Sequence, residues 1–376
     1  MGNAPAYGVR LFDDFSQVES LWACLTPGGG GANMAFQSSR WLSLWYRSFC
    51  ADRGVRPVIA VIVDGPASDS EIDPSTVAMV LPLVRRKRYF LPLVEFADRG
   101  VSDYNQVLLG PRSPVDRASM HAVFKALTRA LRPYALLRLR KMPARIEGAD
   151  NPFGLLSDAR AERLQAHYLR LSESGGDFLR ALSKKKRSEI QRIGRALEQI
   201  GPTSFSMASD PGERRAVFEV IQRAQRQRVP EKGDRYFLEE DGYRQFYRAL
   251  VDEPEFAEMV TVSGIWVDGT PVAGLLGLRY GNRYIGLRIG QSDDAEIVRL
   301  GLGKVLIAET AQWAIGQGLE IFDFSLGGNA LKAWFHPSPF ALIEVTSLLN
   351  GLVPSPFREL AMKPSQRQQT PMALHK

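Results

Sequence analysis

The sequence predicts an α/β (α+β) protein of two lobes, each a mixed, mostly antiparallel sheet flanked by helices. Its 376 residues exceed the roughly 150 of an average domain, so two domains are expected. Hydrophobic residues make up 45% and charged residues 24%, a balance typical of chains that bury their own cores. Helical and strand-like patterns alternate along the chain. We expect an N-terminal lobe at residues 1–165, a C-terminal lobe at 166–355 and a flexible tail at 356–376.

In the first lobe, a glycine-rich loop (P-G-G-G-G-A-N) precedes a helix that Ser38 or Ser39 can cap. Apolar side chains recur along this helix at helical spacing: Trp41, Leu42, Leu44, Trp45 and Phe49. Buried runs such as P-V-I-A-V-I-V-D-G and T-V-A-M-V-L-P-L-V indicate strands, and a polar loop joins these two into a hairpin. The expected strands are residues 57–65, 76–84, 91–96, 106–109 and 134–142, with a further helix at 121–131.

The second lobe begins with a long basic helical region, which Gly201 and Pro202 end. Downstream, three strands joined by tight Asp-Gly and Gly-Asn turns precede a helix that begins on glycines, and a buried strand follows that helix. The expected helices are residues 178–201, 211–228 and 241–251, and the expected strands are 204–207, 259–267, 271–280, 283–290 and 319–326.

The net charge of +7 and the pI near 9.4 indicate either an anionic partner or simply a basic soluble protein. Cys24 and Cys50 have no metal or disulfide spacing, which predicts a reducing, cytoplasmic setting. No apolar run approaches the roughly 18–20 residues of a membrane span, and M-G-N-A-P-A lacks a secretory pattern. We expect no metal, because four histidines are too scattered for ligand spacing: His121, His167, His336 and His375.

Residues 298–304 read V-R-L-G-L-G-K and place two glycines where a helix begins. A helix start offers about four free N–H groups and a partial positive charge, and glycine lets an anion approach this backbone closely. Either the chain simply turns there, or the N–H groups hold a phosphate-bearing cofactor. The stretch is not a P-loop, because no G-x-x-x-x-G-K-[ST] occurs. The candidate cofactor-binding residues are Arg299, Leu300, Gly301, Leu302, Gly303 and Lys304.

Asp323 and Ser325 alternate with Phe322 and Phe324 on the buried strand after this helix. One face of the strand is apolar, so Asp323 and Ser325 share the other face. An acid in a half-buried strand needs a partner or a chemical role. Asp323 either hydrogen-bonds nearby backbone or accepts a proton from an attacking hydroxyl or amine.

A run of four cations, K-K-K-R at residues 184–187, opens the basic helix. The run is either a solvated face or a site for a phosphate or an acidic glycan, with Lys186 and Arg187 as candidate substrate-binding residues. RNA binding is less favoured, because no aromatic side chains for base stacking interleave with the cations. Asp103 and Tyr104 either line a cleft between the lobes, where ligands often bind, or form a turn with a packed tyrosine.

The order of elements in the second lobe resembles the core of the GNAT acyltransferases: antiparallel strands around I-W-V-D-G-T-P-V-A-G, a further strand, a Gly-x-Gly helix start and an apolar strand. The stretch F-D-F-S-L-G-G-N-A-L-K-A-W-F looks like the ending of GNAT-like acetyltransferases associated with cellulose and exopolysaccharide synthesis. F-Q-S-S-R-W-L-S-L-W, an L-P-L strand and Ser102-Asp103-Tyr104 resemble the first half of that group, as does the basic helix. The resemblance covers residues 35–350, and the two-lobed plan is also similar to that of the Fem peptidyltransferases.

This resemblance implies two tandem GNAT-like lobes and direct transfer of an acyl group from acetyl-CoA, or another acyl-CoA, bound across Gly301 and Gly303. It implies a sugar or polysaccharide-precursor acceptor, an amine or a hydroxyl, that enters between the lobes. Lys332 occupies the family's lysine position beside the acyl-transfer site, which implies contact with the acceptor or with oxyanion charge; otherwise it is a solvated lysine on a short helix. Ser325 and Trp334 are further candidate acceptor contacts.

Two alternatives stay open. The first keeps the fold and changes the donor, as in a Fem-like aminoacyl transfer from tRNA, whose binding would depend steeply on salt. The second is a non-catalytic scaffold subunit of an exopolysaccharide-synthesis complex, because Val298 stands where the GNAT signature has Arg or Gln.

Overall fold

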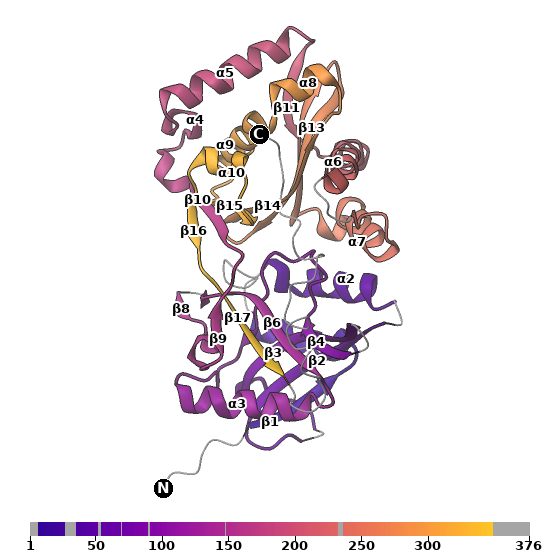
Figure 1. Ribbon diagram of the computed structural model, residues 1–376, viewed down its shortest axis with the longest axis vertical. Coiled ribbons are helices and arrows are strands. Elements are labelled where there is room, and N and C mark those ends of the chain that lie inside the picture. The colour runs from indigo at the N-terminus through magenta and orange to yellow at the C-terminus, as the bar shows by residue number, and fades with distance from the viewer. Residues whose placement is uncertain are drawn as a thin grey trace. The chain divides into compact units, whose positions relative to one another are not determined.

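The computed structural model describes residues 7–26, 35–51, 54–68, 70–88, 91–146, 148–231 and 236–348. The chain divides into two compact units, shown in Figure 1. The described part of unit 1 comprises residues up to 164 together with 341–348, and that of unit 2 comprises residues 165–340. The tail expected at 356–376 lies outside the described residues.

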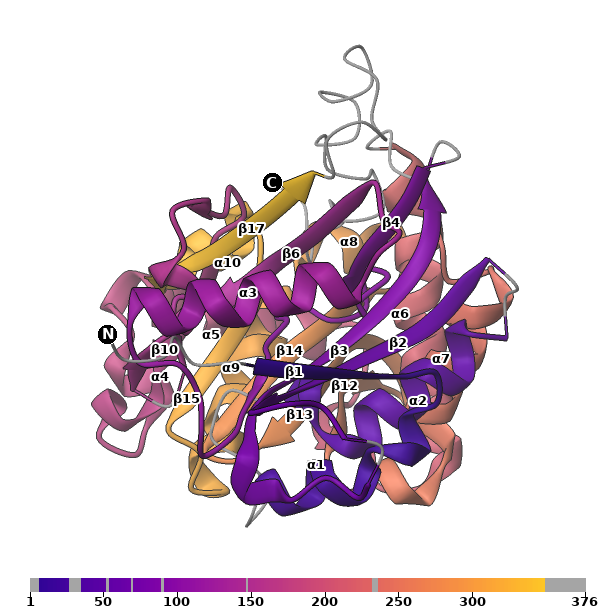
Figure 2. The ribbon, with the colours of Figure 1, turned by 90° about the horizontal axis from the view of Figure 1, so that it is seen from below.

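Unit 1 is built on an eight-stranded sheet. Its strands are β1 (Tyr7–Phe12), β2 (Val55–Asp64), β3 (Val77–Arg88), β4 (Leu91–Phe96), β5 (Leu108–Leu109), β6 (Leu136–Pro143), β9 (Ala159–Ala161) and β17 (Leu342–Leu348), beside a small pair, β7 (Arg145–Ile146) and β8 (Ala149–Asp150). Its helices are α1 (Glu19–Leu25), α2 (Ser39–Phe49) and α3 (Arg117–Ala130). The order is β1-β2-β3-β4-β6-β17-β9, with β5 on β3, and only β4 and β6 pair in parallel. Helix α3 packs on one face of the sheet and α2 lies on the other (Figures 1 and 2).

Strand β17 completes the first sheet although the chain reaches it only after unit 2. It pairs antiparallel with β6 on one side and with β9 on the other. The sequence predicts a second lobe that continues to residue 355, whereas the structure returns residues 341–348 to unit 1. The difference has a physical cause: strand periodicity shows which face is buried but not which distant strand is the partner.

Charged side chains are buried between the central strands of unit 1. Glu95 on β4 accepts from Arg86 on β3 at 2.5 Å and from Arg138 on β6 at 2.9 Å. Burial alone would raise the pKa of Glu95, but the two arginines outweigh burial and lower this pKa to about 2. The carboxylate therefore stays ionised and ties three neighbouring strands together.

Unit 2 is built on a seven-stranded sheet. Its strands are β10 (Ala166–Arg170), β11 (Thr203–Met207), β12 (Val260–Val267), β13 (Thr270–Tyr280), β14 (Arg283–Gln291), β15 (Ile321–Leu326) and β16 (Ser338–Phe340). Its helices are α4 (Phe178–Ala181), α5 (Lys184–Glu198), α6 (Pro211–Glu231), α7 (Asp241–Asp252), α8 (Ala295–Leu300), α9 (Gly303–Gly316) and α10 (Ala330–Phe335). The order is β11-β12-β13-β14-β15-β10-β16, and only β14 and β15 run parallel. Helices α4, α5, α9 and α10 lie on one face, and α6 and α7 on the other (Figure 1).

The basic region predicted as one helix forms two, α4 and α5. Leu182 interrupts it with an extended backbone, and Ser183 caps α5 by accepting from Lys186 N at 3.4 Å. The break lets both helices pack against α9. Phe178 on α4 and Ile190 on α5 belong to the same apolar core as the buried side chains of α9. Across the described residues, no helix has both the length and the apolarity to cross a bilayer.

A row of glycines crosses three neighbouring strands on the α6 face of unit 2. Gly264 pairs with Gly274, and Gly274 pairs with Gly290. A Cβ added at Gly274 would lie 2.4 Å from Val217 Cγ1, and one added at Gly290 would lie 2.7 Å from Ile221 Cα. The row therefore allows α6 to approach the backbone of β12, β13 and β14 closely.

Candidate functional site

Strands β14 and β15 are paired only at their beginnings. Their parallel ladder ends at the pair of Ile285 and Asp323. Just beyond it, Ser325 Oγ donates to the carbonyl oxygen of Gly286 at 3.0 Å, so a side chain replaces the next backbone bond. From there on no ladder joins the two strands, and an unpaired strand edge can hydrogen-bond an extended ligand.

The glycine turn follows β14 after a short loop and helix α8. Helix α8 ends at Gly301, whose φ of 69° and ψ of 57° are left-handed, and α9 begins two residues later. An added Cβ at Gly301 would have no atom within 4 Å, so this turn faces open space. Gln291, the last residue of β14, holds the turn: its Oε1 accepts from Leu302 N at 3.0 Å and its Nε2 donates to Val298 O at 3.3 Å.

The start of α9 has no capping side chain, because Leu302 stands at the N-cap position. The first N–H groups of the helix and its partial positive charge are therefore available to an anion. Two other predicted residues lie on α8: Arg299 is exposed, and Leu300 packs against the apolar core. The structure thus places the six predicted cofactor residues on the end of α8, the turn at Gly301 and Leu302, and the start of α9, with Gly301 facing open space.

Three predicted residues from different helices meet beside this turn. The ammonium groups of Lys186 on α5 and Lys304 on α9 each lie 5.2 Å from the centre of the Trp334 ring on α10. Glu189 joins them, since its carboxylate accepts from Lys304 and, at 3.1 Å, from Trp334 Nε1. The hydrogen bond from Lys304 holds the pKa of Glu189 below its usual value. We call Lys186, Glu189, Lys304 and Trp334 the lysine–tryptophan cluster.

Arg187 does not join this cluster. Its Nη1 donates to the carbonyl oxygens of Arg180, at 2.9 Å, and Leu182, which satisfies the end of α4. In the structure its guanidinium supports local helix geometry, and a substrate contact for Arg187 stays a prediction.

Asp323 is buried, with 1% of its surface exposed, and both carboxylate oxygens are engaged. Oδ2 accepts from Arg283 Nη1 at 2.9 Å, and Oδ1 accepts from Ser325 N at 2.7 Å. Ser325 has a φ of 61°, a conformation that the second bond helps to hold. These contacts fix the strand where it leaves β14, and proton acceptance by Asp323 stays a prediction.

Lys332 is equally buried, with 1% exposure. Its Nζ donates to the carbonyl oxygens of Leu326 at 2.6 Å and Gly327 at 3.0 Å, at the end of β15. Asn329 caps the short helix by accepting from Lys332 N at 2.8 Å. The ammonium points at the turn between β15 and α10, and its predicted contact with the acceptor is untested.

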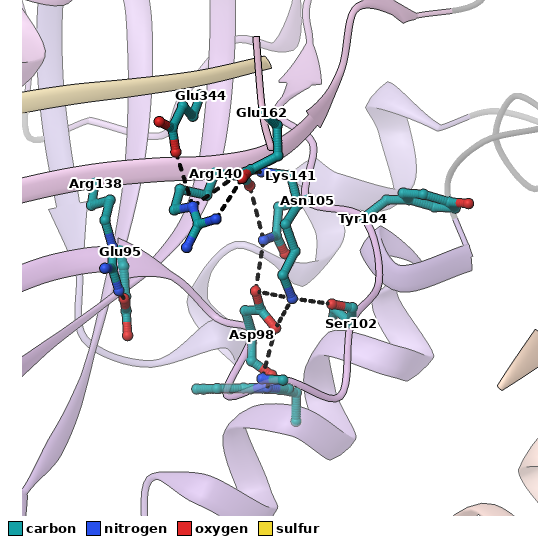
Figure 3. A network of polar contacts seen from close by, with 12 residues as sticks. Glu95, Asp98, Ser102, Tyr104, Asn105, Arg138, Arg140, Lys141, Glu162 and Glu344 are labelled. Atoms are coloured by element: carbon teal, nitrogen blue, oxygen red, sulfur yellow. Dashed lines mark hydrogen bonds and ion pairs between the residues drawn. The ribbon is translucent and has the colours of Figure 1, made fainter. Parts of the chain in front are cut away.

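Asp103 and Tyr104 belong to a loop of unit 1 that a buried polar network holds. Lys141 Nζ lies 2.8 Å from Asp98 Oδ2 and donates to Ser102 O at 2.9 Å. Figure 3 shows Tyr104 pointing away from this network. The Tyr104 ring, 4% exposed, packs edge-on against an aromatic neighbour, and Asp103 is half-buried. Both positions fit a structured turn, and their role at a cleft stays a prediction.

Sequence reasoning missed three residues of this site. Gln291, Glu189 and Arg283 act through partners 7 to 145 positions away, and no local pattern marks Glu189 or Arg283. Gln291 carried a weak signal, as a polar residue at the end of a buried strand that precedes the glycine turn. No group of three or more metal-ligating side chains occurs within the described ranges.

Comparisons with known proteins find a family and a fold to which the chain is similar. Residues 184–333 match the sequence model of a family described as an acetyltransferase (GNAT) domain, and this range contains β14, the glycine turn and β15. None of the curated proteins matches the chain.

Three solved structures share the fold of nearly the whole chain. FemX is 12% identical, with 94% of this chain and 99% of that chain covered and a TM-score of 0.53. L-PGS from Bacillus licheniformis is 12% identical, with 95% and 97% covered and a TM-score of 0.53. A conserved protein of unknown function from Bacteroides thetaiotaomicron VPI-5482 is 10% identical, with 91% and 100% covered and a TM-score of 0.54. At these identities the likeness shows the fold alone, and it confirms the predicted α/β class with two mixed sheets.

Proposed function

We propose that this protein transfers an acyl group, in the first instance acetyl, directly from acyl-CoA to an amine or hydroxyl of a sugar or polysaccharide precursor. One observation carries the proposal: β14 parts from β15 beside an open glycine turn, within residues that match a GNAT domain. The acceptor class rests on the resemblance of residues 322–335 to acetyltransferases associated with exopolysaccharide synthesis.

The residues present fit an acyl-CoA. A pyrophosphate would accept hydrogen bonds from the uncapped start of α9, where Gly301 leaves room for its approach. Lys304 and Lys186 would add positive charge at the same end of the helix. The unpaired edge of β14 would hydrogen-bond the extended pantetheine arm. Acyl-CoA supplies the activated thioester, and the protein binds and orients it.

The protein's own groups then position the two strands. Asp323, held by Arg283, fixes β15 where it leaves β14, and Ser325 spans the gap to Gly286. Backbone N–H groups on the parted edge of β14 would stabilise negative charge that develops on the thioester carbonyl oxygen. Lys332 holds the turn that closes the end of β15.

The test compares two glycines at opposite ends of α9. Gly301 and Gly318 both have left-handed φ, of 69° and 74°, and a Cβ at either would meet open space. Gly301→Trp and Gly318→Trp should therefore carry a similar conformational penalty of about 1–2 kcal/mol. We expect calorimetry to show acetyl-CoA binding by the wild type and by Gly318→Trp, and a loss of at least about tenfold in Gly301→Trp, which corresponds to about 1.4 kcal/mol.

Two outcomes would contradict the proposal. If the wild type does not bind acetyl-CoA, the donor is wrong. If both tryptophan variants lose binding equally while they stay folded by circular dichroism, the cofactor does not lie on the glycine turn.

An aminoacyl-tRNA donor is the second candidate, because α5 presents exposed cations close to the same turn. Lys184, Lys185 and Arg195 are exposed, and the half-exposed Trp334 on α10 lies beside another cation of α5, Lys186. This alternative predicts tRNA binding whose affinity falls steeply between 50 and 200 mM salt, by a factor on the order of 10³ if six phosphates are contacted. Tight tRNA binding together with no acetyl-CoA binding would favour it over the first proposal.

A further inference from the structure

A histidine lies across the strand that parts from β14. His167 on β10 is in antiparallel register with Ser325 on β15, the residue at which the ladder between β14 and β15 has stopped. The register of β10 shifts just after it, between His167 and Tyr168. Sequence reasoning set His167 aside because no metal-ligand spacing surrounds it. Its pairing partner is 158 residues away, which no local pattern reveals.

The surroundings of His167 differ from those of an ordinary structural histidine. Its side chain is half-buried, and its Nδ1 is buried without a hydrogen-bond partner among the described residues. A buried polar atom without a partner is unfavourable, so such an atom commonly belongs to a group that meets a ligand or a water. His167 as a residue is half-buried rather than enclosed, so part of it is in contact with solvent.

Opposite charges act on the ring. Burial and the ammonium of Lys332 on α10 lower the pKa of His167, whereas the carboxylate of Asp323 on β15 and a hydrogen bond with the backbone of Gly327 act in the opposite sense. Arg283 on β14 is paired with that carboxylate, and the flanking strand β16 carries no titratable residue. The balance favours the neutral imidazole, which is the form that can accept a proton near neutral pH.

We infer that His167 is the general base of the proposed acyl transfer, and that Asp323 is a positioning residue that fixes the strand opposite it. The inference rests on the proposed function. As the nitrogen or oxygen of the acceptor attacks the thioester carbonyl carbon, its new bond to carbon forms and the C–S bond breaks. His167 takes the proton of the acceptor and delivers it to the departing thiolate, so the products are the acylated acceptor and the CoA thiol. Asp323, with both oxygens already engaged by Arg283 and Ser325, takes no part in the proton transfer.

The first experiment separates binding from chemistry. Initial rates of acetyl-CoA consumption with D-glucosamine as the probe acceptor are measured from pH 5 to 9, and acetyl-CoA affinity is measured by calorimetry. His167→Gln should lower kcat by about 10²–10⁴-fold and remove the acidic limb of the pH profile, with acetyl-CoA affinity within about threefold of wild type. His336→Asn is the matched control, because His336 is exposed and its φ of 55° suits asparagine.

A second variant tests the electrostatic setting. Lys332→Met removes the ammonium that disfavours the imidazolium, so the acidic limb should move to higher pH. A merely structural role for His167 would leave the position of this limb unchanged in Lys332→Met. The conservative variant Asp323→Asn should lower the rate less than His167→Gln does.

Histidine NMR gives a readout that needs no acceptor. The chain contains four histidines, so His167→Gln identifies the C2 proton signal of His167. We expect this signal to shift when acetyl-CoA is added, and the His336 signal to stay in place. If acetyl-CoA binds and the His167 signal does not shift, or if His167→Gln has the wild-type kcat, the inference is overturned while the proposed function stands. Absence of acetyl-CoA binding would overturn the proposed function and this inference together.

Discussion

Replacing Gly274 by alanine should strain the contact between α6 and the sheet of unit 2, and Val217→Ala should relieve that strain. The added Cβ would lie 2.4 Å from Val217 Cγ1 and 3.1 Å from Val217 O. Overpacking of this kind lowers the free energy of unfolding by about 1–3 kcal/mol. Replacing a strand glycine by alanine without a clash raises it by about 0.5–1 kcal/mol. We therefore expect Gly274→Ala to lower the free energy of unfolding by about 1–2 kcal/mol.

The double variant isolates the contact. Val217 is fully buried, and its truncation removes two methyl groups, so Val217→Ala alone should lower the free energy of unfolding by about 2 kcal/mol. In that background the nearer clash of the Gly274 substitution is gone, and the two changes together should be less destabilising than their sum by at least about 1 kcal/mol.

Gly290→Ala is the matched control. Its Cβ would lie 2.7 Å from Ile221 Cα and 2.9 Å from Ala224 Cβ, so it meets the helix itself rather than the end of a side chain. Truncating Val217 cannot relieve this clash, and the effects of Gly290→Ala and Val217→Ala should add within about 0.5 kcal/mol. Urea unfolding followed by circular dichroism measures the wild type, the three single variants and the two double variants. If Gly274→Ala lowers the free energy of unfolding equally in the wild type and in the Val217→Ala background, the assigned contact is refuted.

The remaining predictions concern charged groups. The fold lowers the pKa of Glu95 from a usual 4.5 to about 2. The ionised carboxylate therefore stabilises the folded state fully above about pH 4.5, and this stabilisation is lost as pH falls through 2. Glu95→Gln should remove about 3 kcal/mol from the pH dependence of the free energy of unfolding, measured by acid unfolding curves. Arg283→Met should lower the free energy of unfolding by about 3–5 kcal/mol, because it leaves the buried Asp323 carboxylate uncompensated. Adding Asp323→Asn should restore part of this loss, and an Arg283→Met variant as stable as the wild type would contradict the pairing. Glu189→Gln should strengthen acetyl-CoA binding by about threefold at low salt, because it frees the charge of Lys304, and weaker binding in calorimetry would count against an anion beside that lysine.

Much of unit 2 could be predicted from local sequence. The strand pattern with Asp-Gly and Gly-Asn turns predicts 259–267, 271–280 and 283–290, and the structure has β12, β13 and β14 there. The helix start on Gly301 and Gly303 is also where the sequence predicts it. These features depend on the periodicity of neighbouring residues and on the conformational freedom of glycine, which are properties of short segments.

The partners within the site could not be predicted in the same way. Lys186, Lys304 and Trp334 were separate candidates in the sequence, and only the packing of α5, α9 and α10 brings them together. The polar strand residue Asp323 was expected, but its engagement with Arg283 depends on the pairing of β14 with β15.

The sequence by itself determined the elements of this protein, the turn on which a helix begins without a capping side chain, and the buried acid beside it. Only the tertiary structure decided that β17 closes the first sheet, that β14 and β15 part after three residue pairs, and that His167 lies opposite Ser325. The reason is physical: backbone propensity and periodicity act over a few residues, whereas sheet partners and charge pairs are chosen by the burial of surfaces that the chain brings together from about 40 to about 200 residues apart.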